Sequence, residues 1–154
     1  LNQIVGGSGF TARLMDEVRE KRGLTYGIST ALIDMDLAKT WQGSFASANE
    51  KVAQAIDVVR GEWARAAGDG VTEKELTDAK TYLVRSYPLR FDSNGAIADI
   101  LVGMQMEGLP TDYVNTRDAR INAVTTVDIK RVAARLMQPD ALHFVVVGQP
   151  DGLK

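Results

Sequence analysis

Apolar residues recur at helical spacing along much of the chain. The clearest stripe steps by four, three and four residues and consists of Val52, Ile56, Val59 and Trp63. Residues at this spacing share one face of a helix, so they predict an amphipathic helix packed on a core. Asn49 precedes the stripe as a favoured N-cap, and Gly68 and Gly70 mark its end.

A shorter helix is predicted ahead of it, from about Thr11 to Lys21. Leu14 and Val18 give this helix an apolar face, and Gly23 stands where a glycine commonly ends a helix. From Tyr26 to Ile33 the pattern alternates with a period of two. The change of period indicates that a strand follows the helix.

A second strand follows the first closely enough to pair with it. Residues 34–39 are a polar connection, and residues 40–47 place Trp41 and Phe45 on the same face of a strand. These two strands predict an antiparallel hairpin.

The second half of the chain is mainly helical. Thr72 and Glu75 form a capping box that opens a helix, and Pro88 ends it. The inward positions of this helix are Leu76, Ala79, Leu83 and Tyr87. Asp92 or Ser93 then caps a helix that is apolar almost all round, at Ile97, Ile100, Leu101, Val102, Met104 and Met106. Such a pattern predicts a buried helix.

Two further helices and an apolar run complete the pattern. A polar helix covers about residues 112–121, and Thr125 with Asp128 opens the last helix. The inward positions of this last helix are Ile129, Val132, Ala133 and Leu136. Residues 142–147 are an apolar run that predicts a strand buried in the sheet.

Strands and helices are segregated along the chain, which indicates an α+β fold with a mainly antiparallel sheet and helices packed on one face. Three strands are few for this much helix, so we expect at least one more strand ahead of Leu1. The 154 residues fit a single domain, residues 1–154. The opening Leu1–Gly7 has neither an initiator Met nor a signal-peptide layout, and we interpret it as a cut inside a longer chain.

Composition excludes several classes of function. The formal net charge is −2 with both signs interspersed, which offers no basic surface for nucleic acid. The chain has no cysteine, hence no disulfide or thiolate site, and it fits the cytosol or a periplasm equally well. No apolar run approaches the roughly 20 residues that span a bilayer, so no membrane partner is expected.

The sequence also offers no metal site. A catalytic zinc needs three protein ligands and an open position. His143 is the only histidine, and its Val-rich surroundings favour a core or edge residue over a ligand. The carboxylates of Asp34, Asp36, Glu73 and Glu75 lie in a hairpin connection and a helix cap, where turn and helix-end roles account for them.

The stretch from Gly6 to Tyr26 carries the most information. On spacing alone it is a glycine turn, a charged amphipathic helix, a glycine stop and a strand that opens with tyrosine, which fits a solvated surface helix. Its glycine pair, followed by Arg-Leu and then Arg-Glu-Lys-x-Gly-Leu-x-Tyr, resembles the start of the C-terminal, non-zinc domain of pitrilysin/insulinase-type zinc peptidases. The similarity continues over residues 70–76, 79–83, 108–113, 124–125 and 145–148. It therefore covers nearly the whole chain.

The resemblance implies a role for two residues seven positions apart. In that family an arginine and a tyrosine reach from the non-zinc half into the zinc site of the other half, and Arg19 and Tyr26 match them. A guanidinium offers forked donors to substrate carbonyl oxygens, and a phenol can donate to an oxygen that gains charge. Arg22 is a near neighbour that periodicity does not exclude as the gripping residue.

The resemblance also implies what the chain lacks. The family's inverted zinc motif, His-x-x-Glu-His, is absent, so no cofactor is expected here and the zinc is expected in a partner half. Gly7 and Gly9 match a glycine loop credited with substrate handling in a related subunit, although a helix cap and turn would account for them as well. The loop lacks the third glycine of a dinucleotide fingerprint and the Lys-Ser/Thr of a phosphate loop.

Three functions fit these observations. In the leading hypothesis the chain is the accessory domain of a zinc metallopeptidase, inactive alone, that binds peptide and completes the active site of a zinc-bearing half on the same polypeptide or a separate subunit. The alternative is a proteolytically inert assembly subunit resembling core proteins of the respiratory complex. A free-standing peptide-binding module is the third.

Overall fold

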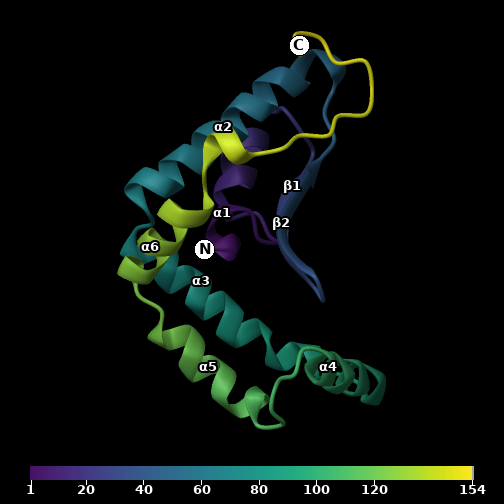
Figure 1. The fold of residues 1–154 in the computed structure, drawn as a ribbon, viewed down its shortest axis with the longest axis vertical. Helices are drawn as coiled ribbons and strands as arrows, with labels where there is room; N and C mark the ends of the chain where they lie inside the picture. Colours follow the sequence, from purple (N-terminus) through teal and green to yellow (C-terminus); the bar gives the residue numbers. More distant parts are fainter. Residues whose placement is uncertain (154) are drawn as a thin grey trace. The chain divides into compact units, whose positions relative to one another are not determined.

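The computed structural model describes residues 1–153 and has the predicted α+β fold (Figure 1). The chain divides into two compact units. One consists of Leu1–Val71 together with the segment from Val127 onward, and the other is Thr72–Thr126. The first unit holds the sheet and the stretch from Gly6 to Tyr26.

A tight hairpin forms the sheet of the first unit. Strand β1, Ile28–Met35, pairs antiparallel with β2, Ala38–Phe45, in a register that runs from Ile28 opposite Phe45 to Met35 opposite Ala38. The connection is shorter than the predicted residues 34–39, because only two residues separate the strands. Asp34 and Lys39 therefore face each other across the ladder, and Lys39 Nζ lies 2.7 Å from Asp34 Oδ2.

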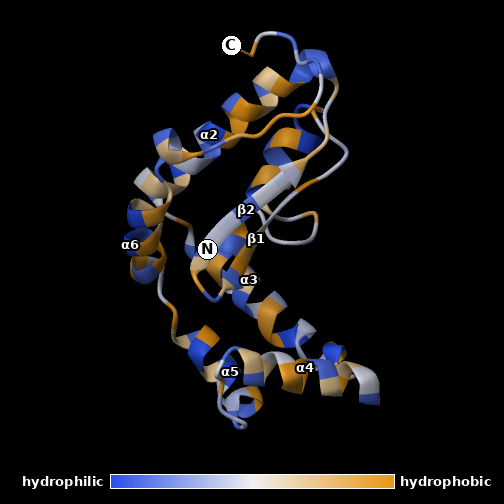
Figure 2. Ribbon diagram, turned by 45° about the vertical axis from the view of Figure 1, so that its right-hand side comes forward, coloured by the Kyte–Doolittle hydropathy of each residue, from blue (hydrophilic) through white to orange (hydrophobic). Residues whose placement is uncertain are grey.

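Helix α2, Val52–Asp69, carries the predicted apolar stripe, and all four of its residues are buried. Apolar and polar residues alternate around it in Figure 2. The prediction of an Asn49 cap was wrong, because a 3₁₀ turn, η2, at Asn49–Lys51 precedes the helix and no side chain caps it. Gly70, at φ 76°, ends α2 as predicted, and its amide donates to the Ala66 carbonyl.

The segment ahead of the hairpin is wound unusually. A short helix, α1, spans Asn2–Val5, and the predicted helix near residues 11–21 includes a π-helix, η1, at Met15–Glu20. Its two predicted apolar residues are fully buried, Leu14 at 1% and Val18 at 0% exposure. They belong to one core, which consists of Val5, Leu14, Val18, Leu24, Ile28, Ala55, Val59, Trp63, Ala66, Ala133 and Met137.

Helix α6, Thr126–Leu136, closes this core from the C-terminal side through Ala133. Ile129 and Ala133 are buried as predicted, but Leu136 is half exposed. The helix ends at Leu136, so the next residue, Met137, points into the core in its place.

The second unit consists of α3, Glu73–Ser86, the 3₁₀ turn η3 at Pro88–Arg90, α4, Asn94–Met106, and α5, Tyr113–Ala123. The predicted capping box of Thr72 and Glu75 opens α3, and Ser93 caps α4. Helices α3 and α5 pack together, and Arg117 of α5 donates to the Leu83 carbonyl at 3.0 Å.

The prediction that α4 is buried was wrong. Met104 is its only buried residue in the described chain, while Leu101, Val102 and Met106 are exposed. An apolar pattern on all sides shows only that a helix could be buried. Among the described residues, no segment packs against most of the apolar surface of α4.

The predicted strand at residues 142–147 was also wrong. After a 3₁₀ turn, η4, at Pro139–Ala141, this segment runs without joining a ladder, so the described residues form a sheet of two strands only. Leu142 and Phe144 pack against the core, whereas Val145 and Val147 are exposed. Among the described helices, none has the length and apolar character needed to cross a membrane.

We expect Leu14→Ala to lower the free energy of unfolding by about 2–5 kcal/mol, because it empties a fully buried site beside α2. Urea unfolding followed by circular dichroism measures this loss. Leu37→Ala is the matched control, since Leu37 is 100% exposed in the hairpin turn and should change the same quantity by less than about 0.5 kcal/mol. Equal losses in the two variants would contradict the assigned core.

Candidate functional site

The π-helix determines how the chain turns between Arg19 and Tyr26. The Lys21 amide donates to the Asp16 carbonyl at 2.9 Å, a bond that spans five residues and widens the helix. Gly23 then takes a left-handed conformation at φ 58°, where its amide donates to the Arg19 carbonyl and the Leu24 amide to that of Val18. The helix therefore ends directly behind Arg19, and the chain reverses toward β1. Single π-turns of this kind are frequent at functional sites.

The loop behind Gly23 is held by hydrogen bonds on both sides of Tyr26. Ser47 Oγ donates to the Leu24 carbonyl at 2.6 Å, and Lys51 Nζ donates to the Gly23 carbonyl at 3.1 Å. The hydroxyl of Thr25 lies 2.7 Å from the Ala46 carbonyl oxygen and accepts from the Gly27 amide at 3.1 Å. The backbone that carries Tyr26 is thus fixed to the end of β2 and to the start of α2.

The side chain of Tyr26, unlike the hydrogen-bonded backbone that carries it, faces solvent. It is 98% exposed, whereas the aromatic core residue Trp63 is only 6% exposed. Tyr26 was expected to open a strand, but β1 begins two residues later, at Ile28, so Tyr26 lies on the loop instead.

Arg19 projects from the end of the π-helix. Its guanidinium forms an ion pair with Glu20 and lies over the ring of Phe10, with Cζ 5.1 Å from the ring centroid. Phe10 is itself 70% exposed, and it was not among the candidates from the sequence. An aromatic residue directly behind the glycine turn is the signal in the sequence that would have identified it.

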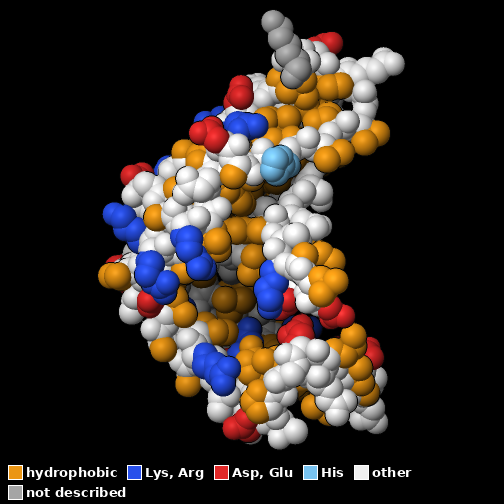
Figure 3. Space-filling view, in the orientation of Figure 1, with side chains coloured by type: hydrophobic (Ala, Val, Ile, Leu, Met, Phe, Trp, Pro, Cys, Tyr) orange, Lys and Arg blue, Asp and Glu red, His pale blue; other side chains and the backbone are white. Residues whose placement is uncertain are grey.

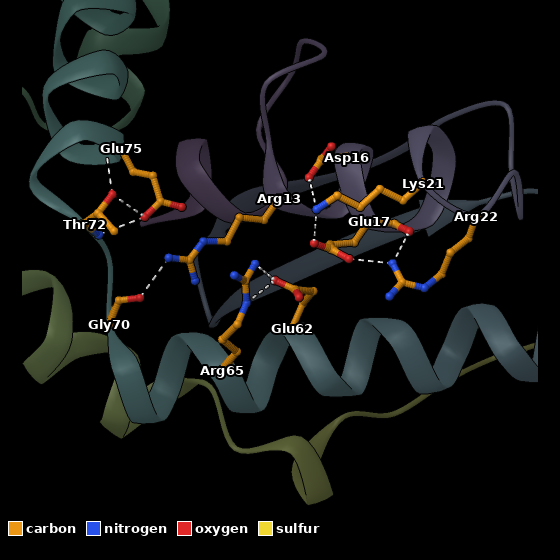
Figure 4. A network of polar contacts seen from close by, with 10 residues as sticks. All are labelled: Arg13, Asp16, Glu17, Lys21, Arg22, Glu62, Arg65, Gly70, Thr72 and Glu75. Carbon is orange, nitrogen blue, oxygen red and sulfur yellow. Dashed lines mark hydrogen bonds and ion pairs between the residues drawn. The ribbon is translucent and has the colours of Figure 1, made fainter.

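Arg22, the other arginine near the turn, is engaged differently. Its Nη1 donates to the Glu17 carbonyl at 2.8 Å and pairs with the Glu17 carboxylate (Figure 4). Lys21 Nζ contacts the same carboxylate at 2.7 Å and Asp16 at 2.7 Å. Arg22 is therefore tied back onto its own helix, whereas Arg19 pairs with Glu20 and lies over Phe10.

Hydrogen bonds hold the Glu17 carboxylate in its charged form. Donation from Lys21, and then from Arg22, lowers the pKa of Glu17 below its usual value. The same network raises the pKa of Lys21 through its bonds to Asp16 and Glu17. This charged cluster braces the π-helix between Asp16 and Gly23.

Arg13 anchors the start of this helix from within the fold. It is buried, and its Nη2 donates to the Gly70 carbonyl at 3.0 Å, beyond the end of α2 (Figure 4). No local pattern in the sequence indicates this contact, because the two residues are 57 positions apart. The Arg-Leu pair of the motif therefore consists of two buried structural residues.

The two candidate glycines differ. A Cβ on Gly7 would lie 2.6 Å from the Gln3 Cα, so this position requires glycine for packing. Gly9 has φ 114° and open space around it, as a turn residue does. Arg19 and Tyr26 lie at the two ends of one turn, and no hydrogen bond joins them within the described residues.

Within the described part of the chain, no group of three or more His, Asp or Glu side chains is arranged to hold a metal ion. His143 lies at the surface, so its interpretation as a core residue was wrong (Figure 3). It is not part of a strand either, because residues 142–147 do not pair. The residues present do not fit a zinc site.

Comparison with known proteins assigns this architecture. Residues 1–83 match the family model described as "Peptidase M16 inactive domain". A crystal structure of a peptidase M16 inactive domain from Pseudomonas fluorescens superposes with a TM-score of 0.78 at 34% identity, over 90% of this chain and 33% of that one.

Two curated bacterial relatives carry contrasting names. An "uncharacterized zinc protease" from Streptomyces coelicolor is 32% identical over 142 residues, covering 86% of this chain and 29% of that protein. A "non-peptidase homolog" from Helicobacter pylori is 24% identical over 141 residues, covering 92% of this chain and 33% of that protein. The chain thus spans about a third of the length of the curated relatives it matches.

Glu17→Gln should make stability less dependent on pH in the acid range. A carboxylate whose pKa is lowered by folding contributes stability above its unfolded pKa, near 4.5, and this contribution is lost as pH falls through the folded pKa. Wild type should therefore exceed the variant in free energy of unfolding at pH 7, and the gap should close below about pH 4.5. Urea titrations at a series of pH values measure it, with the exposed Glu50→Gln as the control. A gap that is constant across this range would contradict the role given to Glu17.

Proposed function

The chain belongs to the peptidase M16 inactive-domain family, and we propose that it is the substrate-gripping, non-zinc domain of a zinc metallopeptidase. In this proposal residues 1–154 act as one C-terminal domain beside a zinc-bearing half, on the same polypeptide or on a separate subunit. The domain binds an extended peptide and completes the active site through Arg19 and Tyr26. It cleaves nothing alone.

The observation that carries this proposal is the contrast between the side chain of Tyr26 and its backbone. A tyrosine with 98% of its surface exposed contributes little to folding, yet the loop beneath it is held by hydrogen bonds from Ser47, Lys51 and Thr25. A fixed backbone under a free phenol is the arrangement that a preorganised donor needs.

The phenol suits one step of peptide hydrolysis. When water adds to the scissile carbonyl, its oxygen gains negative charge, and a donor already in position stabilises that charge without reorganising. One such donor contributes roughly 3–4 kcal/mol in acyl transfer. Tyr26 is proposed to donate its hydroxyl proton in a hydrogen bond to this oxygen.

Arg19 is proposed to hold the peptide in register. Its present partner, Glu20, is half exposed, and an exposed ion pair of this kind contributes little to stability, about 0–1 kcal/mol. Exchanging that partner for substrate carbonyl oxygens therefore costs little. The planar guanidinium can donate to two of them at once, and Phe10 supports it from below.

The zinc of such an enzyme belongs to the partner half in this proposal. It would polarise the scissile carbonyl and lower the pKa of a bound water. No step of that chemistry is assigned to residues of this chain, since its described part holds no ligand cluster.

The competing function is an inert assembly subunit, a possibility made concrete by the relative named a non-peptidase homolog. A scaffold has no use for an exposed tyrosine on a fixed loop, one chain reversal away from a partly exposed arginine, and this favours the peptidase. A free-standing peptide-binding module would bind peptide without any zinc-bearing half. Kinetics on the assembled enzyme separate the three.

With the zinc-bearing half supplied, Tyr26→Phe should lower kcat by roughly 100-fold or more and change KM little, because its donor acts mainly in the transition state. Arg19→Ala should also raise KM, because the guanidinium holds the uncleaved peptide as well. Steady-state cleavage of a quenched fluorescent peptide measures both constants.

Tyr82→Phe and Arg135→Ala are the matched controls, since both residues are exposed on helices outside the turn and should leave the two constants unchanged. Circular dichroism should show all four variants folded. Cleavage by Tyr26→Phe and Arg19→Ala at the wild-type rate would make both ordinary surface residues and favour the inert scaffold.

The double variant tests whether the two residues act on one target. If Arg19 and Tyr26 contact the same stretch of substrate, removing both should raise the activation free energy by less than the sum of the single effects. Strictly additive effects would indicate that they act on separate parts of the substrate.

A further inference from the structure

A groove of about 580 Å³ opens in the first unit beside β2, and Ile28 and Thr30 of β1 also line it. One bank is formed by residues 41–47, and the other by residues 142–148. The floor consists of buried residues of α2, namely Val52, Ile56, Val59 and Trp63. Figure 3 shows hydrophobic side chains at the surface beside His143, which lies on the second bank.

The first bank presents free backbone groups, and the register of the hairpin identifies them. Thr30 of β1 turns away from β2, because its amide donates to the Gly6 carbonyl at 2.6 Å and its carbonyl accepts from Asn2 Nδ2. Residues opposite each other in an antiparallel ladder either exchange both bonds or both turn away. Gly43 faces Thr30, so its amide and carbonyl point into the groove.

The direction of the backbone amides and carbonyls alternates from one residue of β2 to the next. Trp41 and Phe45, two residues on either side of Gly43, direct their amides and carbonyls the same way. None of these groups makes a backbone hydrogen bond to another segment within the described chain. Gln42 and Ser44 face β1 and bond across the hairpin.

The second bank is equally unpaired. Residues 143–150 make no backbone–backbone hydrogen bond in the part of the chain that the structure describes. Their side chains nevertheless begin to alternate as a strand does, with Leu142 and Phe144 against the core and His143 and Val145 outward. Residues 142–148 thus have the alternation of a strand but no paired neighbour, and they lie across the groove from the unpaired edge of β2.

The lining of the groove restricts what fills it. Its residues include no Lys, Arg, Asp or Glu, so it suits neither an ion nor a charged ligand. The indole Nε1 of Trp41 is buried there and has no hydrogen-bond partner within the described residues. A buried donor without an acceptor is unfavourable.

We propose that the groove receives one β-strand from polypeptide of the same protein outside residues 1–154. That strand pairs with Trp41, Gly43 and Phe45 of β2 on one side and with residues 142–148 on the other. Its apolar side chains alternate onto α2, and together the segments form a continuous sheet of four strands.

The position of the groove favours the protein's own polypeptide over a visiting peptide. The floor residues Val59 and Trp63 belong to the hydrophobic core itself, so filling the groove completes the core. Hydrophobic cores are filled by permanent contacts. If only a transient peptide filled this groove, the apolar surface of the core would be exposed to water in every molecule without peptide. The relatives are about three times as long as this chain and have further polypeptide to supply the strand.

Hydrogen–deuterium exchange resolved to single amides tests this proposal in the full-length protein that carries residues 1–154. The amides of Trp41, Gly43 and Phe45 should exchange as slowly as those of Gln42 and Ser44, which serve as controls within the same strand. In residues 1–154 alone, the first three should exchange about 100-fold faster than in the full-length protein.

Three outcomes would overturn the proposal. In the first, the amides of Trp41, Gly43 and Phe45 exchange fast in the full-length protein while those of Gln42 and Ser44 exchange slowly. Alternatively, they become slow in residues 1–154 alone as concentration rises, which assigns the groove to a second copy. Finally, they slow in the full-length protein only after a zinc-chelated sample receives a non-cleavable extended peptide, which assigns the groove to substrate.

Discussion

The amide of Leu24 donates to the carbonyl of Val18, and the geometry of the candidate site follows from this bond. It reaches across the left-handed Gly23 and ends the π-helix while Val18 remains fully buried. Arg19, the next residue, is therefore displayed at the rim of the core, and Tyr26 follows after one reversal of the chain. Without a glycine at this position the turn would be strained, and the two side chains would no longer be carried by one rigid corner.

The core gives this corner its rigidity. Helix α2 supplies the buried stripe that ends at Trp63, and the loop of Tyr26 is bonded to Lys51 and Ser47, just ahead of that helix. We propose that stability and function are thereby divided between neighbouring residues. Leu14 and Val18 are buried and stabilise the fold, while Phe10 and Tyr26 are exposed and Arg19 is partly exposed.

Local patterns in the sequence predicted the fold where a single segment decides the outcome. The stripe on α2, the capping box at Thr72 and the glycine stop at Gly23 are such cases. The exposed α4 and the unpaired residues 142–147 were missed, because burial and strand pairing depend on a second segment that apolarity does not identify. The π-helix was missed as well. Its hydrogen bond spans five residues, but Leu14 and Val18 keep the four-residue spacing that is also expected of an α-helix. Arg19 and Tyr26 came from family resemblance, and spacing alone would have left them as surface residues.

We propose that the corner formed by Arg19 and Tyr26 touches the peptide during proteolysis. Photo-cross-linking tests it most directly, using the enzyme assembled with its zinc-bearing half, zinc removed, and a peptide that carries a benzophenone beside the scissile bond. Mass spectrometry of the adducts should locate them within residues 19–27 of this chain. Adducts confined to the zinc-bearing half, or scattered over this chain without enrichment at that corner, would contradict the account.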